Sequence, residues 1–274
     1  MLNALRRNLG LSSVSGSTSS VDEARQALSE ALTMLQIRKG DARELEAMYQ
    51  RFVLPSLCSR NGRDEDLHRL IGTSVGEGLY ICDALQRSLA QPGDVCEFGV
   101  AQGATSRLLA NEIRATNRTL WLYDSFEGLP KPSEKDVLID DIFGLGSMDA
   151  YAGTMKSPIE LVESKLAEID FPASRYCIRP GWINQTLAAA PMPEQVCFAY
   201  LDFDFYEPLR LALDWLDTRM LPGTSIVVDD YGFFSQGAKL AVDEFVAARG
   251  KSWCLSLPVE AAGKFCILTR AQSS

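Results

Sequence analysis

Residues 196–208 read VCFAYLDFDFYEP, and residues 225–231, after a helix-like run, read SIVVDDY. Both stretches begin as apolar runs typical of buried strands in a parallel sheet, and both end in carboxylates. Because residues two apart share one face of a strand, Asp202 and Asp204 are expected to point the same way. We therefore predict a strand-helix-strand unit that delivers four carboxylates to one ligand-binding edge of a sheet. These are the side chains of Asp202, Asp204, Asp229 and Asp230.

The segment from Glu207 to Met220 joins the two predicted strands and has the pattern of an amphipathic helix. Its apolar residues recur at helical spacing, and Pro208 suits the first turn of a helix. The turn-forming sequence LPGT at 221–224 predicts the end of this helix. The second strand is then expected over 225–230.

Length, charge and cysteine content restrict the class of protein. The chain has 274 residues, 46% of them hydrophobic, which allows one large domain or a domain with an appended helical part. Its net charge of −9 disfavours nucleic acid and anionic membranes as partners. No stretch approaches the roughly 20 apolar residues of a membrane span, so a cytoplasmic location is expected. The seven cysteines never form a Cys-x-x-Cys pair, and we interpret them as reduced core residues.

The first 90 residues are predicted to form a tail followed by helices. Residues 12–20 are almost all Ser, Gly and Thr, so 1–20 is predicted to be a flexible tail. Apolar residues recur at helical spacing over 21–52, with a break near Lys39-Gly40, and this stretch is predicted to be a helical cap or oligomer contact. It would form part of an N-terminal helical region over 21–90. The polar loop at 71–76 precedes a further helix, predicted from Leu79 to Leu89, and could hold a carboxylate on free N–H groups.

A glycine-containing turn links a short predicted strand to a helix. Gly99 and Gly103 would let the backbone come close to a ligand, and Glu97 at the strand end offers a carboxylate beside it. The Gly-x-Gly-x-x-Gly pattern of dinucleotide-binding proteins is absent, which disfavours a nicotinamide-dependent oxidoreductase. The next predicted strand ends in Asp124, a position from which an acid commonly binds two ribose hydroxyls.

Residues 128–156 are rich in Pro, Gly and Asp and are predicted to be an irregular insert. A long insert beside a binding edge is more often a lid than a free linker. The remaining predicted elements are helices over 161–169 and 236–248 and strands over 175–178, 253–257 and 265–269, the last two as a hairpin.

Five motifs in a fixed order resemble one known family. They are EFGVAQG at 97–103, DSFEGLP at 124–130, PGW at 180–182, LDFDFY at 201–206, and PG at 222–223 followed by VDDY at 228–231. Together they resemble the macrocin O-methyltransferase family, and the match runs from about Ile71 to Tyr231. The resemblance implies an α/β, Rossmann-like class I methyltransferase fold with a mostly parallel seven-stranded sheet. The methyltransferase domain would occupy 91–274, behind the N-terminal helical extension and with the lid inserted.

The resemblance also implies S-adenosylmethionine and Mg²⁺ as cofactors, and roles for individual residues. The implied S-adenosylmethionine-binding residues are Thr73 and Ser74 near its carboxylate, Glu97, Gly99 and Gly103 along methionine and ribose, Asp124 and Ser125 at the ribose, and Gly181 and Trp182 at the adenine. The implied metal ligands are Asp202, Asp229 and Asp230, with Asp204 as the general base. Three carboxylates would give Mg²⁺ hard oxygen ligands and leave positions for two neighbouring hydroxyls of an acceptor.

Other interpretations stay open at this point. Asp202 and Asp204 alone would also suit a solvated strand end, which the acids at 229–230 disfavour, or the Asp-x-Asp of a metal-dependent glycosyltransferase. Trp182 would suit simple packing, and His68 lies in a charged stretch that predicts a solvated helix residue rather than a base.

The function that the resemblance implies is methylation of a sugar hydroxyl on a glycosylated natural product or polysaccharide. The alternatives are a catechol-like small-molecule O-methyltransferase and a non-catalytic S-adenosylmethionine-binding module. The expected partners are a small-molecule or glycosylated acceptor and further copies of this chain in a homo-oligomer, without nucleic acid or membrane.

Overall fold

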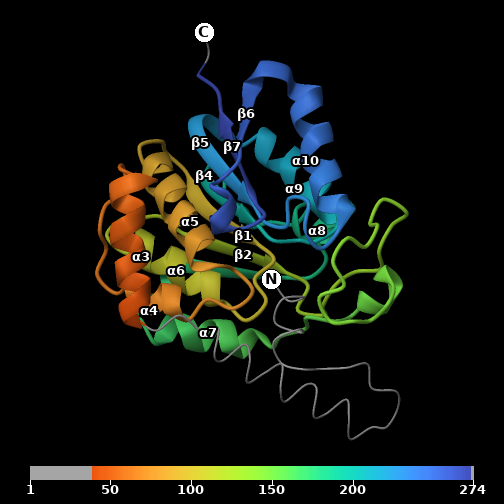
Figure 1. Cartoon of the computed structure of the whole chain (residues 1–274), viewed down its shortest axis with the longest axis horizontal. Coiled ribbons are helices and arrows are strands. Elements are labelled where there is room, and N and C mark those ends of the chain that lie inside the picture. The colour runs from red at the N-terminus through yellow and green to blue at the C-terminus, as the bar shows by residue number, and fades with distance from the viewer. Residues whose placement is uncertain (1–38, 273–274) are drawn as a thin grey trace, which may run out of the picture. The chain divides into compact units, whose positions relative to one another are not determined.

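A seven-stranded sheet organises residues 39–272, the part of the chain that the computed structural model describes (Figure 1). The strands are β1 (Asp94–Phe98), β2 (Leu120–Asp124), β3 (Tyr176–Pro180), β4 (Val196–Leu201), β5 (Met220–Val228), β6 (Trp253–Ser256) and β7 (Cys266–Arg270). Their order is β3-β2-β1-β4-β5-β7-β6. The first five strands are parallel, and β7 pairs antiparallel with both β5 and β6. The mostly parallel sheet and the closing hairpin are thus confirmed.

Helices cover both faces of this sheet (Figure 1). The helices are α3 (Lys39–Phe52), α4 (Arg63–His68), α5 (Val75–Ser88), α6 (Ala104–Ile113), α7 (Ile159–Ala167), α8 (Ile183–Thr186), α9 (Tyr206–Asp217) and α10 (Gln236–Arg249). Two of them, α5 and α6, contact the sheet on one face, while α8, α9 and α10 contact it on the other. This is the layered arrangement that right-handed connections between parallel strands produce.

Alternation along the strands assigns side chains to the two layers. Cys96 and Phe98 of β1 belong to the core shared with α9 and α10, whereas Glu97 between them faces the layer of α5 and α6. All six residues of β4 are buried, because helices pack on both of its faces. The apolar stripe predicted for α9 faces the core. Its buried members are Leu209, Ala212, Leu213 and Leu216.

The boundary between α9 and β5 differs from the sequence prediction. The helix ends at Asp217 rather than Met220, and β5 begins at Met220 although Pro222 and Gly223 follow. Met220 pairs with Val196 at the start of β4, and the register then shifts before pairing resumes at Ser225. The turn-forming residues are therefore accommodated as an irregularity within the strand, where a proline need not donate to a neighbouring strand.

The insert, residues 128–156, is irregular as predicted, apart from the 3-10 turn η1 (Met148–Tyr151). It pairs with the loop that leads into α10 through a bridge between Leu138 and Ser235 and a hydrogen bond from Ile139 N to Phe234 O of 3.0 Å. Buried Met148 and Tyr151 pack with residues of the loops after β4 and β5. The insert is thus attached to those loops, and its role as a lid stays a prediction.

The N-terminal predictions are only partly covered by the described residues. The predicted tail at 1–20 and the predicted helical segment over 21–38 lie outside them. Helix α3 begins at Lys39, where the break was predicted, and α5 begins at Val75 rather than Leu79. The predicted domain boundary near residue 90 stays a prediction.

The seven cysteines are all free, as predicted. Four of them are buried, but Cys58 and Cys254 are exposed, so the prediction of core positions is wrong for these two. Among the described residues, no helix combines the length and apolar character needed to cross a membrane.

Candidate active site

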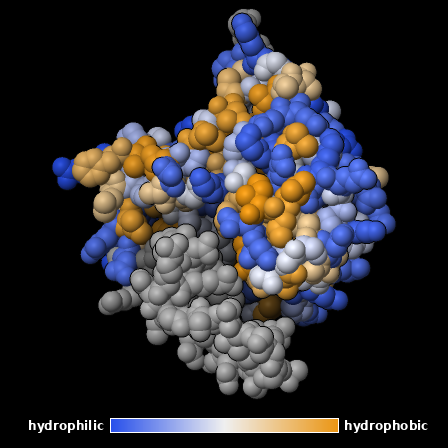
Figure 2. All heavy atoms as spheres, turned by 45° about the vertical axis from the view of Figure 1, so that its right-hand side comes forward, coloured by the Kyte–Doolittle hydropathy of each residue, from blue (hydrophilic) through white to orange (hydrophobic). Residues whose placement is uncertain are grey.

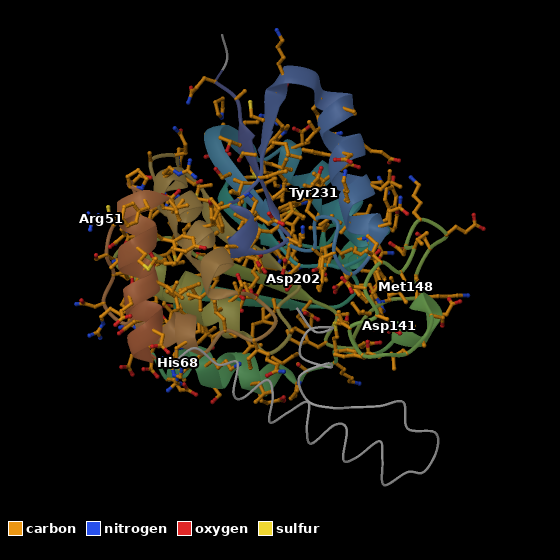
Figure 3. The ribbon with its side chains drawn as sticks, viewed as in Figure 1. Arg51, His68, Asp141, Met148, Asp202 and Tyr231 are labelled. Carbon is orange, nitrogen blue, oxygen red and sulfur yellow. The ribbon has the colours of Figure 1, made fainter. Side chains whose placement is uncertain are left out.

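The carboxyl ends of the five parallel strands lie side by side at one edge of the sheet. Four main-chain hydrogen bonds join them: Gly181 N to Asp124 O (2.9 Å), Gly99 N to Tyr123 O (2.9 Å), Asp202 N to Phe98 O (2.7 Å) and Asp229 N to Leu201 O (2.8 Å). The residues predicted after each of these strands therefore meet at one edge, as expected for a parallel α/β sheet. In Figure 3, Asp202 lies near the middle of the molecule, with Met148 and Asp141 of the insert to its right.

A glycine is required at position 99 because the turn after β1 lies against Asp202, the residue that follows β4. The φ of Gly99 is +85°, and a Cβ built on it would lie 1.9 Å from the carbonyl oxygen of Asp202. Gly103, with φ of +73°, precedes α6, and its Cβ would lie 3.0 Å from Cα of Val162 in α7. Both glycines are thus needed for close contacts within the protein, which keep the turn next to β4 and α7. Their predicted approach to a ligand stays a prediction.

Glu97 and Asp124 flank the glycine turn. Glu97 is 1% exposed and accepts a hydrogen bond from the Ser106 hydroxyl. Burial, with the charge of Asp124 nearby, raises the pKa of Glu97 to about 8. Asp124 Oδ2 accepts the N–H groups of Val100 and Ala101 at 2.7 and 2.9 Å. Its Oδ1 accepts one N–H group, that of Phe126 at 2.7 Å, and so keeps acceptor capacity for a hydroxyl.

The loop before α5 lies beside the same strand ends. Ser74 caps α5 by accepting the Glu77 N–H at 2.9 Å, and it donates to the Ala262 carbonyl. Thr73 is buried, with its hydroxyl oxygen 3.4 Å from that of Tyr200 on β4. The structure therefore places Thr73 against the strand that leads to Asp202, and it gives Ser74 a capping role.

The remaining predicted cofactor residues form turns after β2 and β3. The Ser125 hydroxyl donates to Gly128 O and accepts the Glu127 N–H, both at 3.0 Å. Gly181 has φ of +127°, and Trp182 is the half-buried residue that precedes α8. These residues lie at the same edge as the glycine turn, since β3 and β2 are neighbours.

Three of the four predicted carboxylates form a close group. One carboxylate oxygen from each of Asp202, Asp204 and Asp230 lies within 4.8 Å of the other two. The three residues are half-buried, and each contributes one of these oxygens. Oxygen ligands at such spacing suit a hard divalent cation.

The fourth carboxylate, that of Asp229, turns toward the sheet. Its Oδ2 accepts the hydroxyl of Tyr200 at 3.1 Å, and its Oδ1 accepts the N–H of Asp230 at 2.7 Å. The Tyr200 hydroxyl is also 3.4 Å from Oε1 of Glu77, an acid that is 3% exposed. The sequence interpretation singled out neither residue. The signal available for Glu77 was an acid between two glycines, at the start of a helix that follows the polar loop.

The pKa values of these acids are raised by burial and by the negative charges of their neighbours. Burial raises the pKa of Asp202 well above its usual value, and the charges of Asp229 and Asp230 add to this effect. Burial and the neighbouring Asp202 raise the pKa of Asp204 to about 8. The pKa of Glu77 is raised by burial and by Asp229. A cluster of carboxylates that resists ionisation in this way is stabilised by a bound cation.

His68 is separate from this site, as predicted. It is the last residue of α4 and is half-buried, with Nε2 3.9 Å from Oε1 of Glu65. Figure 3 shows it at the lower left of the molecule, away from Asp202.

Comparison with known sequences identifies the same family as the sequence motifs. A family model described as macrocin-O-methyltransferase (TylF) matches residues 65–266. Demethyldecarbamoylnovobiocin O-methyltransferase of Streptomyces niveus is 30% identical over 204 residues, which cover 68% of this chain and 71% of that protein. The 8-demethyl-8-(2,3-dimethoxy-alpha-L-rhamnosyl)-tetracenomycin-C 4'-O-methyltransferase of Streptomyces olivaceus is 30% identical over 167 residues, which cover 60% of this chain and 62% of that protein. The chain thus spans less than two thirds of the length of the second relative.

Solved structures share the fold. The O-methyltransferase NovP superposes with a TM-score of 0.62 at 22% identity, covering 83% of this chain and 100% of that chain. The calicheamicin methyltransferase CalS11 superposes with a TM-score of 0.56 at 21% identity, covering 93% of this chain and 94% of that chain. These likenesses confirm the predicted α/β methyltransferase fold.

Proposed function

Because this chain belongs to the macrocin O-methyltransferase family, we propose that it is an S-adenosylmethionine- and Mg²⁺-dependent O-methyltransferase acting on a sugar hydroxyl. The observation that carries this proposal is the group of carboxylates from Asp202, Asp204 and Asp230, which adjoins the glycine turn at Gly99. The relative from Streptomyces olivaceus is named for a substrate that bears a rhamnosyl group. A sugar is therefore the acceptor that we propose for this chain.

The donor set fits a divalent metal. Mg²⁺ prefers carboxylate oxygens and keeps several positions for water or substrate, and the crowded acids here favour a cation between them. When bound, Mg²⁺ would supply a Lewis acid that lowers the pKa of an acceptor hydroxyl. Asp202 and Asp230 belong both to the ligand set that the family resemblance implies and to the close group in the structure.

Asp204 and Asp229 have different surroundings, which supports different roles. Asp204 lies in the close group with Asp202 and Asp230, within reach of a hydroxyl held there, and we assign it the role of general base. Asp229 is the third ligand by resemblance, and the Tyr200 hydroxyl orients its carboxylate through one oxygen. A hydrogen-bonded ligand of this kind is typical of metal sites.

The proposed S-adenosylmethionine site lies along the ends of β1, β2 and β3. It comprises Thr73, Ser74, Glu97, Gly99, Gly103, Asp124, Ser125, Gly181 and Trp182. Asp124 Oδ1 would accept a ribose hydroxyl, and the Gly99 turn would hold the methionine part beside Asp202. S-adenosylmethionine supplies an activated methyl group, so the protein's contribution is to place the acceptor hydroxyl in line and remove its proton.

The insert is the proposed contact for the rest of the acceptor. Four large apolar side chains of its outer part are exposed: Val137, Ile139, Phe143 and Leu145. Figure 2 is turned so that the side of the molecule that carries the insert comes forward, and it shows hydrophobic patches among hydrophilic ones. An exposed apolar surface beside a polar site suits a substrate in which a sugar is attached to an apolar group. A cytoplasmic location, a homo-oligomeric state and the absence of nucleic-acid or membrane partners belong to the same proposal.

Turnover by the purified protein tests this function. We expect S-adenosylhomocysteine release with rhamnosides that carry neighbouring hydroxyls, loss of release on addition of EDTA, and recovery with excess Mg²⁺. A matched panel of catechols serves as the comparison. Faster methylation of catechols would favour the small-molecule alternative, and cofactor binding without turnover of any acceptor would favour the non-catalytic alternative. Activity that persists in EDTA would contradict metal dependence.

A further inference from the structure

Asp136 is a buried carboxylate on the insert that belongs to none of the predicted sites. It is 5% exposed. Its Oδ2 accepts both the N–H and the hydroxyl of Ser133 at 2.7 Å, and its Oδ1 accepts the N–H of Tyr206 at 2.7 Å. A buried carboxylate is stable only when hydrogen-bond donors or positive groups compensate its charge. Here the compensation comes from the insert and from the first residue of α9.

The first turn of α10 meets the same carboxylate. A Cβ built on Gly237 would lie 1.9 Å from Asp136 Oδ1 and 2.9 Å from Tyr206 N. Asp136 therefore lies where the amino ends of α9 and α10 come together, and both helix ends favour a negative charge. Asp136 supplies an acceptor at the start of α9, where Phe205 provides no side-chain oxygen.

The loops that lead into these helices carry the site carboxylates. Asp204 has φ of +58° and Asp230 has φ of +55°, in the left-handed region that residues with side chains rarely adopt. Such conformations persist only when the surrounding structure imposes them. Tyr206, which bonds to Asp136, follows Asp204 by two residues.

Aromatic packing supports the same attachment. The ring of Phe205 stacks against Phe234 with centroids 6.1 Å apart, and Tyr151 of the insert packs on Phe234 at 4.8 Å. These contacts join the loop after Asp204, the loop after Asp230 and the insert into one small core. Asp136 is the polar contact of this junction that reaches the main chain of α9 directly.

We propose that Asp136 is a positioning residue of the carboxylate site. By holding the Tyr206 N–H against the first turn of α10, it fixes how far apart the loops of Asp204 and Asp230 lie. The insert therefore stabilises the arrangement of acids that binds the cation, in addition to any contact with the acceptor. This inference rests on the proposed metal-dependent function.

Calorimetric titration of the full chain with Mg²⁺ and, separately, with S-adenosylhomocysteine tests the proposal. Asp136→Ala removes the acceptor for the Tyr206 N–H and should weaken Mg²⁺ binding about tenfold or more, as loss of an outer-shell contact typically does, with S-adenosylhomocysteine affinity within about twofold. Asp136→Asn keeps an oxygen for that N–H, although its amide nitrogen cannot accept the Ser133 N–H, and it should recover part of the Mg²⁺ affinity.

Lys135→Ala is the matched control. Lys135 also attaches the insert to α10, through Glu244 at 3.1 Å, and its Nζ lies 3.7 Å from the ring centroid of Tyr206, but it does not bond to the main chain of α9. Its loss should leave Mg²⁺ affinity within about twofold, because an exposed ion pair and an exposed cation–π contact each contribute little, and the Tyr206 N–H keeps its acceptor. Equal losses of Mg²⁺ affinity in Lys135→Ala and Asp136→Ala would overturn the proposal, since any loosening of the insert would then be enough to weaken Mg²⁺ binding.

Unchanged Mg²⁺ affinity in Asp136→Ala would also overturn it. If that variant is recovered unfolded, Asp136→Ser takes its place under the same criteria, because serine is too short to reach the Tyr206 N–H. A wild-type protein that binds no Mg²⁺ would overturn both this inference and the proposed function, whereas Mg²⁺ binding that is insensitive to Asp136 would overturn this inference alone.

Discussion

Asp202→Asn should lower turnover about a thousandfold or more while leaving S-adenosylhomocysteine affinity within about twofold, because it removes a charge from the proposed metal site without changing side-chain shape. Asp202 belongs to the close carboxylate group, and its main-chain oxygen, which contacts the glycine turn, is unaffected by the substitution. Steady-state kinetics at saturating Mg²⁺ and calorimetric titration with S-adenosylhomocysteine measure the two quantities.

Asp214→Asn provides the control for the chemical change itself. Asp214 lies on α9, in exposed ion pairs with Arg210 and Arg249. Its conversion to asparagine should leave turnover within about twofold, because surface ion pairs contribute little to stability and Asp214 does not belong to the close carboxylate group. Full metal-dependent activity in Asp202→Asn would show that the metal is bound elsewhere.

Gly99→Ala should destabilise the fold by on the order of 3–5 kcal/mol, or prevent folding, since it combines a left-handed backbone with a steric overlap. The added Cβ would lie 1.9 Å from the carbonyl oxygen of Asp202, and a main-chain atom cannot move aside as a flexible side chain can. Any folded fraction should bind S-adenosylhomocysteine weakly, because the turn would shift away from β4. Urea unfolding followed by circular dichroism measures the change.

Gly146→Ala separates the two causes. Gly146 has φ of +82°, close to that of Gly99, but nothing lies within 4 Å of its added Cβ. Gly146→Ala should therefore lower the free energy of unfolding only through the left-handed backbone conformation, by about 1–2 kcal/mol. Equal destabilisation by the two substitutions would mean that the contact between Gly99 and Asp202 contributes nothing.

Local patterns were sufficient to predict the centre of the fold. The apolar runs before Asp202 and Asp229 predicted two buried strands with carboxylates at one edge, and the structure confirms both strands. Rules for parallel strands then place the glycine turn beside them. The start of β5 was missed because Pro222 and Gly223 signal a turn, whereas pairing of Met220 with Val196 overrides that signal.

Contacts between distant residues could not be predicted in this way. The hydrogen bond from Tyr200 to Asp229 and the approach of Glu77 join three separate elements, and no periodicity marks them. Asp136 likewise lies in a segment without motif, and its partner Tyr206 is 70 residues away. The glycines illustrate the same limit: sequence indicates an unusual backbone at Gly99, but only the fold reveals that its neighbour is Asp202.

A crystal structure with S-adenosylhomocysteine and Mn²⁺, recorded at a wavelength where manganese scatters anomalously, tests the central claim most directly. We predict one anomalous peak within direct coordination distance of carboxylate oxygens of Asp202 and Asp230, with the ribose of S-adenosylhomocysteine on Asp124. Coordination by Asp229 would support the ligand set that the family resemblance implies and leave Asp204 as the base. A peak remote from these acids, or no peak at saturating Mn²⁺, would contradict the proposed metal-dependent mechanism.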